Sequence, residues 1–221
     1  MAKLFIDDIL DLRQYEKVRE EKRKEIIDLK RIRRVGVGPF ISLVFENQAT
    51  MQFQIQEMAR AERIIEERLL QDEIDIYNNL IPERGEISIT LLIELTSKEE
   101  LYFWLPKLVG IENSLYLELH FNGLSNMQNE LQLLRDNTLP GHILNESNSV
   151  LTIKASVQEE HQEMLTRANI TASVHYLKFQ LSESEQKLFP LSDIIIRFDH
   201  TAYRHEANIS KELQTAITGD W

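Results

Sequence analysis

The sequence contains no cysteine among its 221 residues, and this absence excludes several kinds of chemistry. Without a thiol, the chain cannot form disulfides, use a cysteine nucleophile, or hold zinc or an iron–sulfur cluster through sulfur ligands. The sequence also lacks a Walker A phosphate loop, an H-E-x-x-H zinc helix, a G-x-S-x-G nucleophile turn and the motifs of protein kinases. No motif therefore indicates a known catalytic class.

Long apolar runs are missing as well. An uninterrupted apolar stretch such as residues 101–105 is far shorter than the roughly 20 residues of a membrane-spanning helix. The first eight residues lack the apolar core of a signal peptide and already contain two aspartates. We therefore expect a cytoplasmic protein that does not enter the membrane.

Charge is abundant but unevenly distributed. The formal net charge is -11, which argues against nucleic-acid binding because contacts to phosphates need a basic surface. Residues 1–34 nevertheless contain 11 Lys/Arg and 8 Asp/Glu, so this segment carries +3 and the remainder -14. A basic front and an acidic body can attract each other within one chain or between subunits, and a homo-oligomer is an open alternative.

Residues 11–34 form the first predicted helix. A thin apolar stripe and alternating charges on the other faces are typical of an amphipathic helix. The segment ends in a basic cluster of Lys30, Arg31, Arg33 and Arg34. These cations either complement the helix dipole at an exposed C-terminus or form a binding site for an anion or a partner.

Residues 47–82 contain the central helices and the most unusual pattern of the chain. Glu62 and Glu73 fall on their apolar side, where an unpaired carboxylate would cost several kcal/mol. We expect Glu62 to be mostly buried and paired with an arginine, a histidine or a metal. The alternative for each glutamate is a structural salt bridge, for example to Arg60 or Arg63. The stripe around Glu62 consists of Met51, Ile55, Met58, Ile65 and Leu69.

The remainder, residues 86–221, is predicted to contain mainly strands and short helices. The strands are expected at 86–95, 115–121, 150–157, 171–181 and 191–198, and the short helices after Ser97 and at 158–167, 182–189 and 210–218. Residues 124–149 are rich in turn-forming and polar residues, and we expect a long surface excursion with a helical turn at 129–134. The whole chain, residues 1–221, is thus predicted to be one α+β domain. An antiparallel sheet or partial barrel would pack against the N-terminal helices.

A dense polar cluster follows the last predicted strand. Two histidines beside carboxylates are chemically suited to a divalent metal, although their spacing matches no known ligand motif. Alternatively, the segment ties the C-terminal helix to the body through Arg–Glu and His–carbonyl bonds. Because Glu62 and Glu73 need partners, we expect one of them to meet this segment in a single polar pocket. The cluster consists of Asp199, His200, Tyr203, Arg204, His205 and Glu206, and the candidate metal ligands are Glu62, His200, His205 and Glu206.

Six blocks of the sequence carry a resemblance to a known family. They are RRVGVGPFISLVFEN, QIQEMARAERI, YNNLIP, VGIENSLYLEL, SVHYLKF and FDHTAYRHEA, in this order. Together they resemble an uncharacterised bacterial family, the domain of unknown function 3501, over nearly all of the chain. The sequence departs from that family at Thr201, where proline is usual, and in a longer 124–149 segment. The departure at Thr201 puts the rigidity of the turn after His200 in question.

The resemblance implies a setting but no reaction. Members are often encoded beside rubrerythrin-like proteins and an iron–sulfur oxidoreductase, which implies peroxide defence or anaerobic redox work with these proteins as partners. The resemblance points to ten polar residues in or between these blocks, namely Glu57, Arg60, Glu62, Glu73, Tyr77, Asn78, His175, Asp199, His200 and Tyr203. The candidates for a binding pocket are Glu57, Arg60, Glu62, Glu73, Tyr77, Asn78, Tyr203 and Arg204. His175 is a single histidine on an apolar strand face, which is more typical of a hydrogen-bonded core residue than of a ligand.

Two functions fit these observations. The first is a non-catalytic accessory or binding protein of a redox or oxidative-stress system. The second is a metal-dependent enzyme or metal carrier that uses a Glu/His pocket, with a divalent metal as its cofactor.

Overall fold

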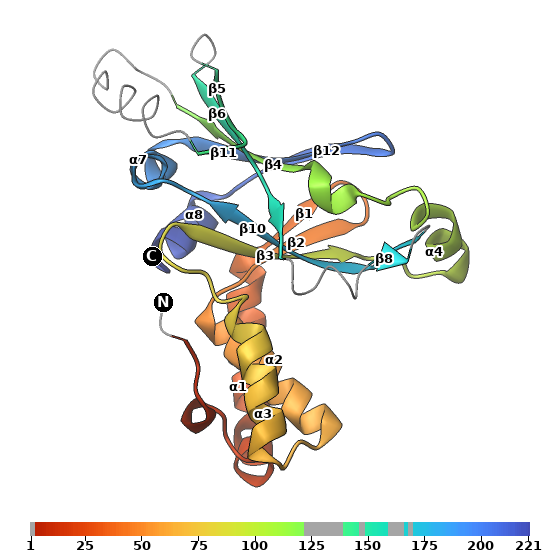
Figure 1. Cartoon of the computed structure of the whole chain (residues 1–221), viewed down its shortest axis with the longest axis vertical. Helices are drawn as coiled ribbons and strands as arrows, with labels where there is room; N and C mark the ends of the chain where they lie inside the picture. Colours follow the sequence, from red (N-terminus) through yellow and green to blue (C-terminus); the bar gives the residue numbers. More distant parts are fainter. Residues whose placement is uncertain (1–2, 122–138, 146–148, 159–165, 168–169) are drawn as a thin grey trace.

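A computed structural model describes the chain except for residues 1–2, 122–138, 146–148, 159–165 and 168–169. Two five-stranded antiparallel sheets form the body, and three helices form an arm that projects from it (Figure 1). The fold class is therefore α+β with antiparallel sheets, as the sequence predicts.

The first sheet has the strand order β1-β2-β3-β10-β7. Its central strand, β3, alternates side chains so that Ile87, Ile89 and Leu91 are buried on the face toward the second sheet. Tyr176 of β10 points to the other face and packs against the apolar cluster of the arm. The strands are β1 (Arg34–Val37), β2 (Ile41–Phe45), β3 (Glu86–Ile93), β7 (Ser156–Val157) and β10 (Val174–Gln180).

The second sheet has the strand order β12-β11-β4-β6-β5. Leu115, Leu117 and Leu119 of β4 are fully buried and alternate with half-buried residues, as a strand with one face on the core requires. The strands are β4 (Leu115–His120), β5 (His142–Asn145), β6 (Val150–Lys154), β11 (Asp193–His200) and β12 (Tyr203–Asn208). A separate pair joins β8 (Thr166–Arg167) to β9 (Ile170–Thr171).

The two sheets share one apolar core and one continuous crossing of the chain. β6 ends in the second sheet at Lys154, and β7 begins in the first sheet at Ser156, with the buried Ala155 between them. The predicted strand at 150–157 is thus two strands in different sheets. The sheets remain open rather than closing into a barrel, so both of them have edges.

Short helices cap the body. Ser97, Ser182 and Ser210 each accept a hydrogen bond from the third backbone N–H that follows, and three of the predicted short helices begin at these residues. The α-helices are α4 (Lys98–Trp104), α7 (Glu183–Leu188) and α8 (Lys211–Thr218). Of the described 3-10 helices, η2 (Ile111–Ser114) and η5 (Phe189–Leu191) belong to the body, whereas η1 (Ile6–Asp8) lies beside the arm. In the part of the chain that is described, no helix is long and apolar enough to cross a membrane.

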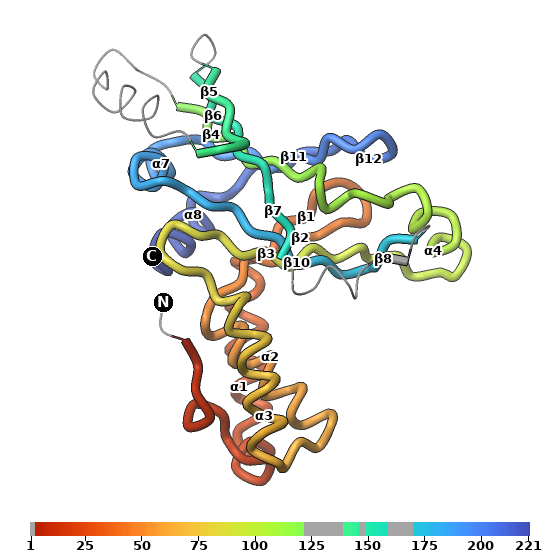
Figure 2. The backbone as a smooth tube through the Cα atoms, viewed as in Figure 1, coloured from red at the N-terminus to blue at the C-terminus, as the bar shows by residue number. Residues whose placement is uncertain are grey.

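The arm consists of α1 (Leu12–Arg33), α2 (Gln48–Glu62) and α3 (Glu67–Asn78). Figure 2 shows α2 leaving the sheets and α3 returning to them, while the segment before α1 runs alongside. Asn47 caps α2, because its side-chain oxygen accepts a hydrogen bond from the Thr50 N–H. A second apolar core holds the arm together and consists of Leu4, Ile9, Met51, Ile55, Ile74, Tyr77, Leu80 and Ile81.

The base of α1 is fastened to the C-terminal part of the chain. The guanidinium of Arg33 binds both carboxylate oxygens of Asp220, at 2.6 and 2.8 Å, and also donates to the carbonyls of Phe45 and Ala216. Only 4% of the Arg33 side chain is exposed. This buried, bidentate pair fixes the angle at which α1 leaves the body.

The structure corrects the prediction for residues 47–82. The helix breaks after Glu62, because Arg63 adopts the left-handed conformation (φ 54°) and its N–H closes the last turn. The apolar stripe therefore ends at Met58, and Ile65 points into solvent. Glu62 is exposed at the end of α2, so the prediction that it is mostly buried is wrong.

Two further predictions need correction in the second half of the chain. Residues 203–208 form a strand, β12, directly after β11, so 191–198 does not hold the last strand. Residues 142–145 of the predicted surface excursion form β5. The predicted helical turn at 129–134 lies outside the described residues, as does most of the helix predicted at 158–167, whose last two residues form β8.

Candidate functional site

A carboxylate clamp joins α1 to α2 near the middle of the arm. Glu57 accepts hydrogen bonds from the Tyr15 hydroxyl at 2.7 Å and from two nitrogens of Arg19 at 2.8 and 2.9 Å. The hydrogen bonds from Arg19 contribute most, and together with the bond from Tyr15 they lower the pKa of Glu57 to about 2 although burial opposes the shift. Arg60 lies 3.5 Å from Glu57 and from Glu16. Glu57 and Arg60, two of the predicted candidates for a binding pocket, therefore lie together, but their contacts join two helices of the arm.

Next to this clamp lies a groove between α1 and α2, which we term the basic groove. Its rim consists of three cations on α1 and Arg34 at the start of β1. Its floor is apolar, and the groove has a volume of about 390 Å³. Ile26 and Phe53 form the buried and half-buried floor, while 56% of Ile27 is exposed beside them. The lining residues are Arg23, Ile26, Ile27, Lys30, Arg31, Arg34, Phe53 and Glu57.

The rim cations are weakly compensated. Among the residues that the structure describes, neither Arg23 nor Lys30 has an ion pair, and Arg31 reaches only Asp28 at 4.0 Å between exposed side chains. Arg34 pairs with Glu94 at the edge of the first sheet. The Glu57 carboxylate within the groove is already neutralised by Arg19. The groove is therefore positively charged on a chain whose net charge is -11.

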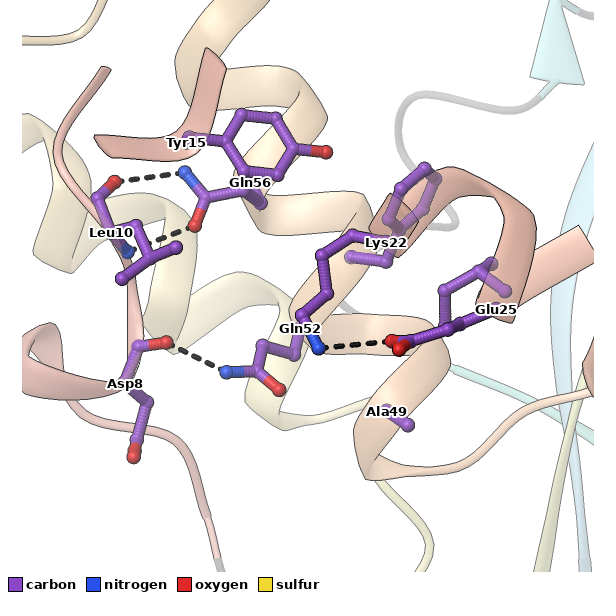
Figure 3. Close-up of a pocket in the computed structure, with 10 residues that line it drawn as sticks. Asp8, Leu10, Tyr15, Lys22, Glu25, Ala49, Gln52 and Gln56 are labelled. Carbon is purple, nitrogen blue, oxygen red and sulfur yellow. Dashed lines mark hydrogen bonds and ion pairs between the residues drawn. The ribbon is translucent and has the colours of Figure 1, made fainter. Parts of the chain in front are cut away.

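A second, smaller cavity lies between α1, α2 and the segment before α1 (Figure 3). Its polar side chains bind one another or the backbone: Gln56 exchanges two hydrogen bonds with the Leu10 backbone, Gln52 donates to the Asp8 carbonyl, and Lys22 pairs with Glu25. Its volume of about 180 Å³ is small for a ligand site. These contacts hold the N-terminal segment against the helices.

Glu62, Glu73 and Tyr77 lie together on the other side of the arm. Burial, followed by repulsion from Glu62 and Asp72, raises the pKa of the half-buried Glu73. Burial also raises the pKa of Tyr77 to about 12. Within the described part of the chain, neither glutamate has an ion pair, so the salt bridges to Arg60 or Arg63 considered from the sequence are not made.

Asn78 and His175 have structural roles. The Asn78 amide exchanges two hydrogen bonds with the Leu4 backbone, at 2.8 and 2.9 Å, and holds the N-terminal segment on α3. His175 is buried, with its Nε2 2.9 Å from Thr171 Oγ1 and 2.9 Å from the Ala172 carbonyl oxygen. Burial lowers the pKa of His175, and nearby Glu112 opposes this.

The polar cluster at 199–206 forms the β11–β12 hairpin. The Tyr203 hydroxyl donates to the Val37 carbonyl at 2.6 Å, and the His205 ring packs 4.5 Å from the Tyr203 ring. Both side chains press on Gly38, where a Cβ atom would lie 2.5 Å from the Tyr203 hydroxyl. The hairpin is thus tied to the β1–β2 turn rather than to the C-terminal helix.

The remaining polar residues of the hairpin lie on its surface. Arg204 pairs with Asp199 at 3.2 Å, and His200 Nε2 lies 3.2 Å from the Val109 carbonyl oxygen. Glu206 is exposed and faces Arg197 across the strand pair. These contacts are typical of a charged, protected edge strand.

The predicted single pocket is not formed. The hairpin belongs to the second sheet and contacts the β1–β2 turn, whereas Glu62 and Glu73 lie on the arm, at the opposite end of the molecule (Figure 1). The candidate ligands Glu62, His200, His205 and Glu206 are therefore in two separate places. Across the described ranges, no group of three or more His, Asp or Glu side chains is arranged to hold a metal ion.

Only part of the basic groove could be predicted from the sequence. The cluster at the end of the first helix gave Lys30, Arg31 and Arg34. Arg23 and the exposed Ile27 were missed, although their spacing of seven and four residues from Lys30 and Arg31 is the signal that places them on one face.

The sequence profile of the family described as "Protein of unknown function (DUF3501)" matches residues 3–138 and 125–221. The chain belongs to this family. The fold is similar to that of a crystal structure described as a novel protein of unknown function from Burkholderia pseudomallei K96243. The two chains are 27% identical, each is covered over 99% of its length, and the TM-score is 0.79. No curated protein matches this DUF3501 chain.

Proposed function

We propose that this DUF3501 protein is a non-catalytic binding protein that docks an acidic, partly apolar segment of a partner protein in the basic groove. One observation carries the proposal: four cations surround an apolar floor that includes the exposed Ile27, on a chain that is acidic elsewhere. Cations around apolar side chains are suited to an amphipathic helix with acidic flanks.

The groove combines two contributions to binding. The rim cations would steer an acidic segment and set its register, which acts mainly on the association rate and on specificity. Ile27 and Phe53 would supply apolar area that the partner removes from water. Because the rest of the surface is acidic, an acidic partner would be repelled elsewhere and directed to this groove.

The biological setting rests on the family resemblance. A cytoplasmic redox or oxidative-stress system would supply the partner, with a rubrerythrin-like protein or an iron–sulfur oxidoreductase as the first proteins to test. The alternative of a metal-dependent enzyme or carrier would require its Glu and His ligands to converge. In the described residues these ligands lie in two places, so no observation favours it over binding.

Isothermal titration calorimetry of the full chain with each purified candidate partner tests the proposal. We expect binding that weakens with salt and that the Arg23→Glu/Lys30→Glu variant weakens by roughly tenfold or more. The matched control is Lys17→Glu/Lys24→Glu, which makes the same charge change at exposed positions of α1. Equal loss in both variants, or no binding at low salt, would overturn the groove as the docking site.

A further inference from the structure

The helix α3 presents an acidic and apolar face to solvent. At about 100° per residue, Leu69, Asp72, Glu73 and Ile76 lie on one side, opposite the buried Ile74. Leu69 is 39% and Ile76 is 43% exposed. Asp72 and Glu73 lie between them. Asp72 pairs with Arg68 one turn earlier on the same helix, at 3.5 Å between exposed side chains, and among the described residues Glu73 has no ion pair. We term this surface the α3 face.

The α3 face and the basic groove complement each other in charge, apolar content and length. The groove extends along α1 from Arg23 to Arg33 and ends at Arg34, and the α3 face follows α3 from its start at Glu67 to Ile76, with the exposed Ile65 just before the helix. At 1.5 Å per helical residue, residues 23–33 correspond to about 16 Å and residues 67–76 to about 15 Å, so the two surfaces have similar lengths. Each surface carries exposed aliphatic side chains between charges, and the two sets of charges have opposite sign.

We propose that the α3 face of a second copy of this chain occupies the basic groove. This inference rests on the groove being a docking surface, as in the proposed function, but it needs no outside protein. Ile27 would pack against Leu69 and Ile76, while Arg23 and Lys30 would pair with Asp72 and Glu73. The aliphatic residues that are exposed on both surfaces would thereby leave water.

The positions of the two surfaces along the arm favour a closed pair. The groove lies in the half of α1 that joins the body at Arg34, whereas the α3 face starts at the free end of the arm, beside the break at Arg63 (Figure 1). In two antiparallel arms, the free end of each arm meets the base of the other. Both contacts then form at once about a two-fold axis, and the interface is used twice.

Self-association would also regulate the groove. A dimer would cover the surface that the proposed partner needs, so the acidic segment of the partner and the α3 face would compete. Higher concentrations of the chain would then weaken its apparent affinity for the partner by mass action.

Sedimentation velocity of the full chain over a concentration series tests the dimer. We expect the wild type to form a dimer, and both the groove variant Arg23→Glu/Lys30→Glu and the α3 variant Asp72→Lys/Glu73→Lys to be monomers at the same concentrations. The control Glu67→Lys/Asp75→Lys changes the charge of α3 equally on its other sides and should remain a dimer. A monomeric wild type, or dimeric variants, would overturn the proposal.

Mixing the two monomeric variants gives the sharpest result. In a mixed pair, the acidic groove of one variant faces the basic α3 of the other, and the two unchanged surfaces face each other. Both contacts again join opposite charges, so the equimolar mixture should recover the dimer. A mixture that stays monomeric would show that the losses in the single variants do not come from this contact.

Calorimetry with the candidate partners separates this inference from the proposed function. The α3 variant keeps an intact groove, so it should bind the partner at least as tightly as the wild type does. Loss of the dimer with retained partner binding supports both ideas. A dimer that depends on both surfaces, together with partner binding that the groove variant does not change, supports the dimer and overturns the proposed function.

Discussion

Replacing Glu57 with glutamine should destabilise the chain in a way that depends on pH. The lowered pKa of Glu57 means that the charged form of this carboxylate is more stable in the folded chain than in the unfolded chain. This contribution is fully present above the ordinary pKa of 4.5 and is lost as the pH falls toward 2. Glu57→Gln keeps the size of the side chain and removes the charge.

The structure sets the size of the effect. A shift from 4.5 to about 2 corresponds to at most about 3.4 kcal/mol, at about 1.36 kcal/mol per pKa unit. Glu57 is 24% exposed, so water screens part of this interaction. We therefore expect Glu57→Gln to lower the free energy of unfolding by about 1–2 kcal/mol at pH 7.

Urea unfolding followed by circular dichroism between pH 7 and pH 3 measures this difference. The matched control is Glu20→Gln, since Glu20 pairs with the same Arg19 at 3.4 Å but is 81% exposed, and we expect it to cost about 0.5 kcal/mol or less. The gap between wild type and Glu57→Gln should narrow below pH 4.5. A loss no larger than that of Glu20→Gln, or a gap that widens in acid, would refute the reasoning.

Two further substitutions test the contacts that fix the arm and the hairpin. Asp220→Ala should lower the free energy of unfolding in urea by about 3–5 kcal/mol, because it leaves the Arg33 guanidinium buried without its carboxylate. The double variant Arg33→Met/Asp220→Ala should recover part of this loss. If the effects of the two substitutions on the free energy of unfolding were strictly additive, the two residues would not be coupled. Gly38→Ala should lower the free energy of unfolding by about 2 kcal/mol or more, because φ is +75° and the new Cβ would meet the Tyr203 hydroxyl. Gly36→Ala has open space around its Cβ and should lower it by less than about 1 kcal/mol. Equal thermal unfolding midpoints for the two variants would count against this account.

Local signals in the sequence predict most of the elements. The N-caps Asn47, Ser97, Ser182 and Ser210 mark helix starts, because a side-chain oxygen satisfies a backbone N–H wherever the helix begins. Alternating apolar residues mark the strand around Leu117 in the same local way. The α+β class and the presence of the N-terminal helices could therefore be predicted, whereas their projection from the body as an arm could not.

Other features depend on contacts that local patterns do not contain. Arg63 ends α2 in a left-handed conformation without the glycine that usually signals such an end, so the apolar periodicity of the sequence continues through Glu62 although the helix does not. β12 is mostly polar, and pairing with β11 is what defines it as a strand. No pattern in the sequence measures how far Glu62 lies from His200, and the single pocket was wrong for that reason.

The crossing at Ala155 has a consequence for how the protein is made. The chain builds β1 to β3 in one sheet and β4 to β6 in the other, returns to the first sheet for β7 and β10, and finishes in the second. During synthesis from the N-terminus, β3 therefore cannot pair with β10, nor β4 with β11, until these later strands have been synthesised. In both sheets one edge of a central strand therefore stays unpaired until the last quarter of the sequence has been synthesised. Arg33 likewise has no ion-pair partner until Asp220, 187 residues later, has been synthesised. The nascent chain is thus most exposed to wrong strand pairing late in its synthesis, when the arm can already be folded.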